Sequence, residues 1–109
     1  MKSYTDLERS KKLAEILPLE SADMYYDYDV QKHEYYPMIM DEQFDDTCIP
    51  AWSSTALMNI LDRGALFKTP QGWVSQTYIE YEAITSNYYS NSVDAAFEIV
   101  VWLKENEKI

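Results

Sequence analysis

The stretch NSVDAAFEIVVWL, residues 91–103, decides more about the fold than any other part of the sequence. Asn91 is a favourable N-cap, and Asp94 three residues later suits the positive end of a helix dipole, so a helix is predicted to begin here. Its apolar residues form two stripes at helical spacing, one of Val93, Ala96, Phe97, Val100 and Leu103 and one of Ala95, Ile99 and Trp102. A helix that is apolar on so many sides is usually covered on most of them. We therefore expect it either at the centre of the core or partly buried by a second copy of the chain, with Ala95, Ile99 and Trp102 as the candidate homodimer interface.

Two strands are predicted upstream, in residues 23–40. Residues 23–30 (DMYYDYDV) alternate with a period of two, which is typical of a half-buried strand. One face carries Met24, Tyr26, Tyr28 and Val30, and the other carries Asp23, Tyr25, Asp27 and Asp29. Residues 35–40 (YYPMIM) read as a second strand, and Pro37 places it at an edge or a bulge because proline lacks an N–H. The polar residues 31–34 between the two strands predict a hairpin.

The other elements are a first helix, a second helix and one or two further strands. Thr5 and Glu8 have the spacing of a capping box, and Pro18 is expected to end the helix that begins there. Pro50 is expected in the first turn of a helix that ends near Gly64. Residues 69–72 read as a turn, and a longer strand is expected from residue 73 to 83. Residues 1–109 thus predict a single α+β domain, a small antiparallel sheet of three to four strands packed against about three helices in two layers.

The charge of the chain restricts its partners. The 109 residues include 19 acidic and 9 basic side chains, a formal net charge of −10. This balance argues against direct binding of nucleic-acid phosphates or of an anionic membrane, which both need clustered Lys and Arg. It favours solubility, a cationic partner or mimicry of a polyanion. No signal peptide and no membrane-spanning run is evident, so a cytoplasmic location is expected.

The sequence contains no catalytic motif that would predict an enzyme. His33 is the only histidine and lies in a polar connection, where we expect it to be exposed. Cys48 is the only cysteine, so it has no disulfide partner, and a small semi-buried residue is the expected role. The acidic loop 41–46 lacks the alternating ligands and the glycine of a calcium loop. We therefore expect no catalytic residues, no metal and no cofactor.

One feature stands out from this background. Residues 23–46 hold eight carboxylates, one lysine and six aromatic residues. Tyrosine supplies contact area at low entropic cost, and carboxylates steer a basic partner, so this mixture suits a protein interface. The candidate binding residues are Tyr25, Asp27, Asp29, Tyr35, Asp41, Glu42, Phe44, Asp45 and Asp46.

The sequence therefore predicts a non-enzymatic protein that binds a basic protein through this hairpin region, in a sharper version as a nucleic-acid mimic or a phage or mobile-element inhibitor. The alternative from another class is a small-molecule binder with an aromatic pocket between the sheet and the helices. In a third interpretation, half of these tyrosines lie in the core and the acidic side chains only confer solubility.

Three stretches resemble a known group of proteins. IPAWSSTALMNIL (49–61) resembles a Pro-Cys-Trp-Ser-Leu-Ala-Ala-Leu-Leu pattern, NSVDAAFEIVVWL (91–103) resembles an Asn-Pro-Val-Asp-Ala pattern, and residues 1–24 are similar to the start of that group. The group is a family of small acidic proteins from gut bacteria and their phages or mobile elements, with no established activity. The chain has Ala51 and Ser92 where the patterns have Cys and Pro. The resemblance assigns no functional residue.

Overall fold

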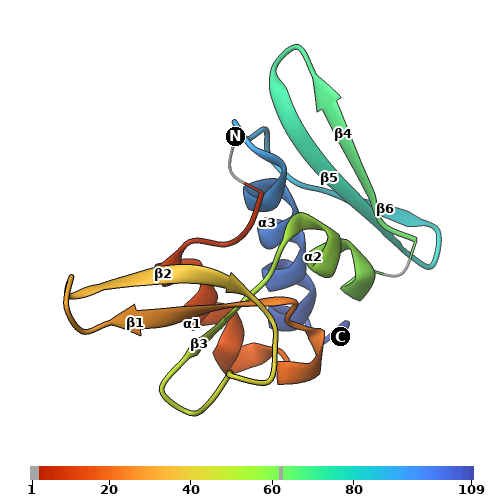
Figure 1. Ribbon diagram of the computed structural model, residues 1–109. Coiled ribbons are helices and arrows are strands. Elements are labelled where there is room, and N and C mark those ends of the chain that lie inside the picture. Colours follow the sequence, from red (N-terminus) through yellow and green to blue (C-terminus); the bar gives the residue numbers. More distant parts are fainter. Residues whose placement is uncertain (1–2, 62) are drawn as a thin grey trace.

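The computed structural model describes residues 3–61 and 63–109, which form an α+β domain (Figure 1). In chain order, the elements of this part of the chain are α1 (Leu7–Ile16), the short 3-10 helix η1 (Leu19–Ser21), β1 (Met24–Asp29), β2 (Glu34–Ile39), β3 (Ile49–Ala51), α2 (Ser54–Ile60), β4 (Ala65–Thr69), β5 (Gly72–Ile79), β6 (Glu82–Thr85) and α3 (Ser92–Glu105). The predicted class is confirmed. The strands, however, form two separate antiparallel sheets of three strands each, with the helices between them.

The first sheet has the order β2-β1-β3. The predicted hairpin is confirmed, with Tyr26 opposite Pro37 and Asp29 opposite Glu34, and Pro37 lies on the edge strand as expected. The prediction for Pro50 was wrong, because residues 49–51 pair with β1 as a strand, with Pro50 opposite Tyr25. The second helix therefore begins later, where the Ser53 hydroxyl accepts a hydrogen bond from the N–H of Ala56.

The second sheet has the order β4-β5-β6 and is built from the continuous segment 65–85. The predicted turn at 69–72 is confirmed, and Gly72 takes a φ of +133° that favours glycine. The predicted strand 73–83 is interrupted after Ile79, because Glu80 adopts the left-handed conformation and reverses the chain into β6. Trp73 and Tyr89 exchange two backbone hydrogen bonds, which tie the segment before α3 to the sheet.

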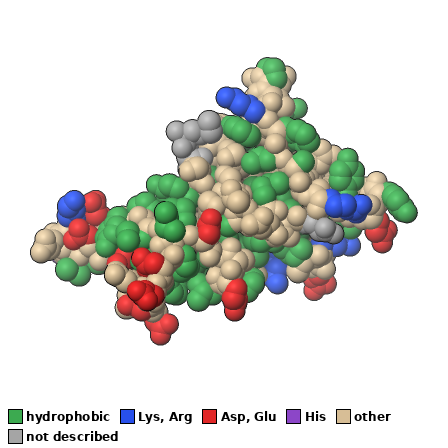
Figure 2. Space-filling model, turned by 45° about the vertical axis from the view of Figure 1, so that its right-hand side comes forward, with side chains coloured by type: hydrophobic (Ala, Val, Ile, Leu, Met, Phe, Trp, Pro, Cys, Tyr) green, Lys and Arg blue, Asp and Glu red, His purple; other side chains and the backbone are tan. Residues whose placement is uncertain are grey.

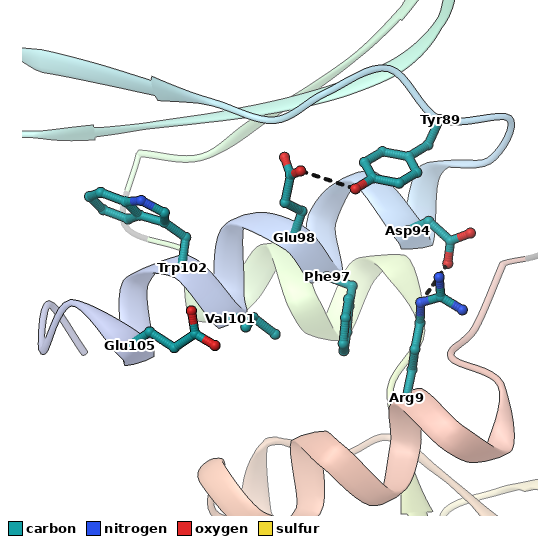
Figure 3. Close-up of a pocket in the computed structure, with 8 residues that line it drawn as sticks. All are labelled: Arg9, Tyr89, Asp94, Phe97, Glu98, Val101, Trp102 and Glu105. Carbon is teal, nitrogen blue, oxygen red and sulfur yellow. Dashed lines mark hydrogen bonds and ion pairs between the residues drawn. The ribbon is translucent and has the colours of Figure 1, made fainter.

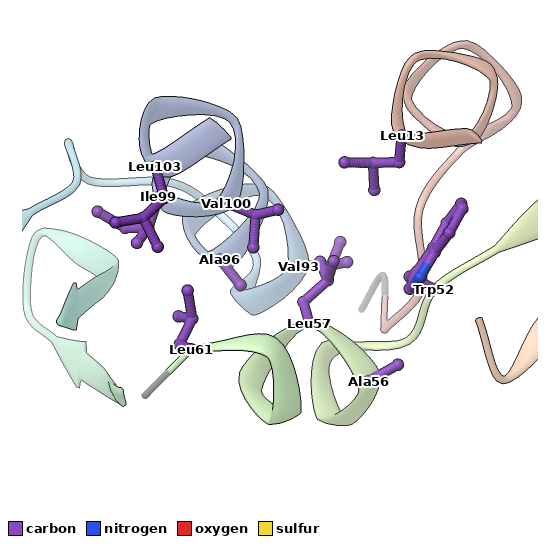
Figure 4. Close-up of a cluster of buried hydrophobic side chains, with 10 residues drawn as sticks. All are labelled: Leu13, Trp52, Ala56, Leu57, Leu61, Val93, Ala96, Ile99, Val100 and Leu103. Carbon is purple, nitrogen blue, oxygen red and sulfur yellow. The ribbon is translucent and has the colours of Figure 1, made fainter. Parts of the chain in front are cut away.

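The core lies between α3, α2 and α1 (Figure 4). Asn91 caps α3 as predicted, since its side chain accepts a hydrogen bond from the N–H of Asp94. The apolar stripe of Val93, Ala96, Val100 and Leu103 is buried here against Trp52, Leu57, Leu61 and Leu13. Burial of a valine or leucine side chain contributes about 1.5–3 kcal/mol. The central position predicted for this helix is the one observed.

The segment before α1 is part of the interior. Asp6, not Thr5, caps α1 by accepting a hydrogen bond from the N–H of Arg9 at 2.8 Å. Thr5 is fully buried, and its hydroxyl accepts a hydrogen bond from the N–H of Trp52 at 3.1 Å and pairs with the Ser10 hydroxyl at 2.7 Å. The threonine thus joins the N-terminal segment to the start of α2. Among the described residues, none of the helices has the length and apolar character that a membrane span requires.

Candidate functional site

The β1–β2 hairpin projects from one end of an elongated molecule that measures 49 × 30 × 20 Å (Figure 1). Figure 2 shows carboxylates and apolar side chains gathered next to each other at this end. Because side chains alternate along a strand and cross-strand partners share a face, the register sorts them into two groups. One face carries Tyr25, Asp27 and Asp29 with their partners on β2, and the other carries Tyr26 and Tyr28 with theirs.

At the base of the acidic face, Tyr25 is fully buried, so its prediction as a binding residue was wrong. Its hydroxyl donates a hydrogen bond to Asp41 at 2.7 Å, and its ring meets that of Phe44 edge-on at 5.5 Å. The hydrogen bond to the Asp41 carboxylate is the main cause that raises the pKa of Tyr25 to about 12, and burial adds to it. Tyr25 and half-buried Phe44 therefore hold the loop 41–48 against the hairpin rather than forming a contact surface.

Further along this face, carboxylates surround Cys48. The Sγ atom of Cys48 lies 3.8 Å from Asp27 and 3.6 Å from Asp45, and the Tyr36 hydroxyl donates to Asp27 at 3.2 Å. Burial raises the pKa of the Cys48 thiol, which disfavours the reactive thiolate. The Thr47 hydroxyl and N–H both donate to Asp45 and lower the pKa of that carboxyl. Asp27 and Asp45 thus stabilise the local structure through hydrogen bonds, in addition to contributing negative charge.

The other predicted acidic residues divide by what they contact. Asp29 accepts hydrogen bonds from the N–H groups of Gln31 and Lys32, which shape the hairpin turn. Glu42 and Asp46 are exposed, as is Glu34, and none of their three carboxylates accepts a hydrogen bond from the described residues. These three carboxylates are therefore available to a partner without cost to the fold.

The opposite face of the hairpin carries apolar surface that the sequence-based prediction largely missed. Tyr28 and Tyr35 stack edge to face at 5.0 Å, and both are exposed, at 41% and 37%. Ile39 is 77% exposed on the same face. Tyr35 was predicted as a binding residue and is exposed, but it lies on the face away from Asp27. No sequence signal shows that the hairpin extends beyond the helices, so the exposure of Tyr28 was not predicted.

The candidate homodimer interface is corrected by the burial of α3. Ala95 and Ile99 are buried within the chain, where α3 packs against β5, and only Trp102 of the three is partly accessible. The stripe therefore belongs to the interior of one chain. His33 is exposed in the hairpin turn, as expected, in the left-handed conformation. Within residues 3–61 and 63–109, no three His, Cys, Asp or Glu side chains are placed to hold a metal ion.

The hairpin end thus has an acidic face and a supporting loop, which hold most of the predicted binding residues, and an aromatic face. Comparison with known proteins adds no assignment to this arrangement. No protein-family model matches the chain, and neither a curated protein nor a solved structure is significantly similar to it.

Proposed function

We propose that the protein is a non-enzymatic interaction protein whose β1–β2 hairpin and following loop bind a basic protein. The carrying observation is the concentration of charge. Residues 23–46 have eight carboxylates and one lysine, which gives −7 of the formal −10, and they form the projecting hairpin and its loop. Long-range attraction from such a surface raises association rates with a cationic partner.

The aromatic face supplies the second requirement of an interface. Exposed Tyr28 and Tyr35, with Ile39 beside them, offer apolar area next to the carboxylates. Interfaces are enriched in tyrosine at their centre, and charged groups at the rim act on rate and specificity more than on affinity. A basic partner that carries apolar residues therefore fits this end better than a small ion does.

The test compares two variants of equal charge. In the hairpin variant, Glu34→Gln, Glu42→Gln and Asp46→Asn remove three carboxylates that have no hydrogen bond from the described residues. The control variant, Glu15→Gln, Glu20→Gln and Glu82→Gln, removes three exposed carboxylates elsewhere. Immobilised wild type and both variants are exposed to lysate at 50 and 300 mM NaCl, and the captured proteins are identified by mass spectrometry.

We expect basic proteins that the wild type and the control retain at low salt, and that the hairpin variant loses. High salt shortens the screening length from about 14 to about 6 Å and should release them. Equal capture by the two variants would mean that the hairpin has no special role. Competition by duplex DNA tests the sharper version, because a nucleic-acid mimic occupies the DNA-binding surface of its partner, and partners that DNA does not displace would contradict mimicry.

A further inference from the structure

A groove of about 250 Å³ runs along the side of α3 that faces away from the core, between α1 and the segment before α3 (Figure 3). Glu98, Val101 and Glu105 form its floor, with Phe97 towards α1 and Trp102 on the other side. Glu98 and Glu105 are seven residues apart, so they lie on the same side of the helix with about 10 Å of rise between them. The groove therefore combines a floor of two carboxylates and one valine with aromatic walls.

One end of this groove already holds a guanidinium group. The Nε atom of Arg9 lies 3.3 Å from the Asp94 carboxylate, and its guanidinium is centred 5.4 Å from the ring of Phe97. A cation over an aromatic ring with a carboxylate beside it is a favourable arrangement, and the planar guanidinium suits it better than an ammonium does. Arg9 thus shows which chemistry the walls of the groove accept.

The other end repeats the same components without a cation. Trp102 and Glu105 lie there, and no Lys or Arg among the described residues lines this end. Arg9 does not reach it, because Glu105 lies eight residues beyond Phe97, about 12 Å along the helix. The Glu105 carboxylate makes no ion pair or hydrogen bond with the described residues.

Glu98 is fixed in position between the two ends. Its carboxylate accepts hydrogen bonds from the N–H of Asn87 at 2.7 Å, from the Asn87 side chain at 2.7 Å and from the Tyr89 hydroxyl at 3.0 Å. A carboxylate has about four acceptor positions, so one is left for a ligand. Because the side chain is already ordered, binding costs little further conformational entropy.

We propose that the Trp102 end of this groove binds the arginine side chain of a peptide or protein, with its guanidinium stacked on the indole and its charge met by Glu98 and Glu105. The volume of about 250 Å³ is below the 300–1,000 Å³ usual for drug-sized ligands, which favours a single side chain. Free arginine fits less well, because its own carboxylate would approach Glu98 and Glu105. The site uses none of the hairpin residues, so it stands independently of the function proposed above.

The test is a titration of the ¹⁵N-labelled protein, read from the indole N–H signals of its three tryptophans. The probes are N-acetyl-arginine methylamide, its lysine counterpart and free arginine, each up to about 50 mM. We expect the arginine amide to shift the Trp102 signal and to leave Trp52 and Trp73 unchanged. The lysine amide and free arginine should bind roughly fivefold more weakly, as expected for the loss of one stacking or charge contact.

Substitutions then locate the site. Glu105→Gln removes an exposed carboxylate and should weaken binding of the arginine amide roughly fivefold, whereas Glu82→Gln, outside the groove, should leave binding unchanged. The hairpin variant described above should bind as the wild type does, so the two proposals fail separately. No shift at Trp102, equal binding of the arginine and lysine amides, or equal binding by Glu105→Gln and the wild type would each overturn the proposal.

Discussion

Replacing Thr5 by valine tests whether the segment before α1 contributes to the stability of the core. Valine keeps the shape of threonine but removes the hydroxyl, which accepts from the N–H of Trp52 at 3.1 Å and pairs with Ser10 at 2.7 Å. A buried N–H left without its acceptor costs about 1–3 kcal/mol. Ser10 keeps a second hydrogen bond, from its hydroxyl to the carbonyl of Thr5 at 3.3 Å, so it adds little to the loss. We expect the free energy of unfolding to fall by about 2 kcal/mol and Tm by about 8–10 °C.

Urea unfolding, followed by tryptophan fluorescence, measures this difference. The matched control is Thr55→Val, which makes the same change at an exposed position of α2 and should stay within about 0.5 kcal/mol of the wild type. If Thr5→Val lowered the free energy of unfolding no more than Thr55→Val does, the Thr5 hydroxyl would not stabilise the fold. That result would refute a stabilising role for its hydrogen bond with Trp52.

Three further predictions follow from backbone geometry, ionisation and burial. Gly72→Ala should destabilise the fold by at least about 1–3 kcal/mol in thermal unfolding, because a Cβ would lie 2.6 Å from the carbonyl oxygen of Tyr89 at a φ of +133°; an unchanged Tm would contradict this. The raised pKa of Tyr25, about 12, means that its stabilisation is complete below pH 10 and is lost as the pH rises towards 12. In the Tyr25→Phe variant, the free energy of unfolding should therefore decrease less between pH 10 and 12 than in the wild type. The same pH dependence in both proteins, measured by urea titrations, would argue against the contact with Asp41. Cys48 should react with a thiol reagent at pH 7 at least tenfold more slowly in the folded than in the urea-unfolded chain, because the thiol is buried and its pKa is raised; equal rates would show that it is accessible.

Elements with local signals were predictable from the sequence. The Asn91 cap and the apolar spacing placed α3 correctly, and alternation with Pro37 predicted the hairpin and its edge strand. These signals lie within one or two turns of chain, where capping and side-chain periodicity act.

Structural features that depend on contacts with residues distant in the sequence could not be predicted. Proline is favourable in the first turn of a helix, which is why Pro50 was expected there, but pairing with β1 makes it part of a strand. Alternation grouped Tyr25 with Asp27 correctly, yet it could not show that the later loop with Phe44 covers Tyr25. The division into two sheets likewise follows from which strands meet, and periodicity does not encode that.

The site was predictable to a similar degree. Composition alone locates the acidic region, and the structure separates its carboxylates into those that hold turns, such as Asp29, and those that face solvent, such as Glu42. The groove along α3 could not be predicted from the helical pattern alone. It requires Arg9 and Tyr89, which come from other segments and flank the helix.

The position of α3 in the chain has a consequence for synthesis. Of the ten residues in the cluster of Figure 4, five belong to α3. A ribosome releases residues 1–91 before any of them, so Trp52, Leu57 and Leu61 lack the half of the cluster that α3 supplies while the two sheets form. The nascent chain therefore exposes apolar surface until α3 emerges, at about 5–20 residues per second. Mutations that slow the docking of α3 should accordingly increase aggregation during expression more than they lower the stability of the finished fold.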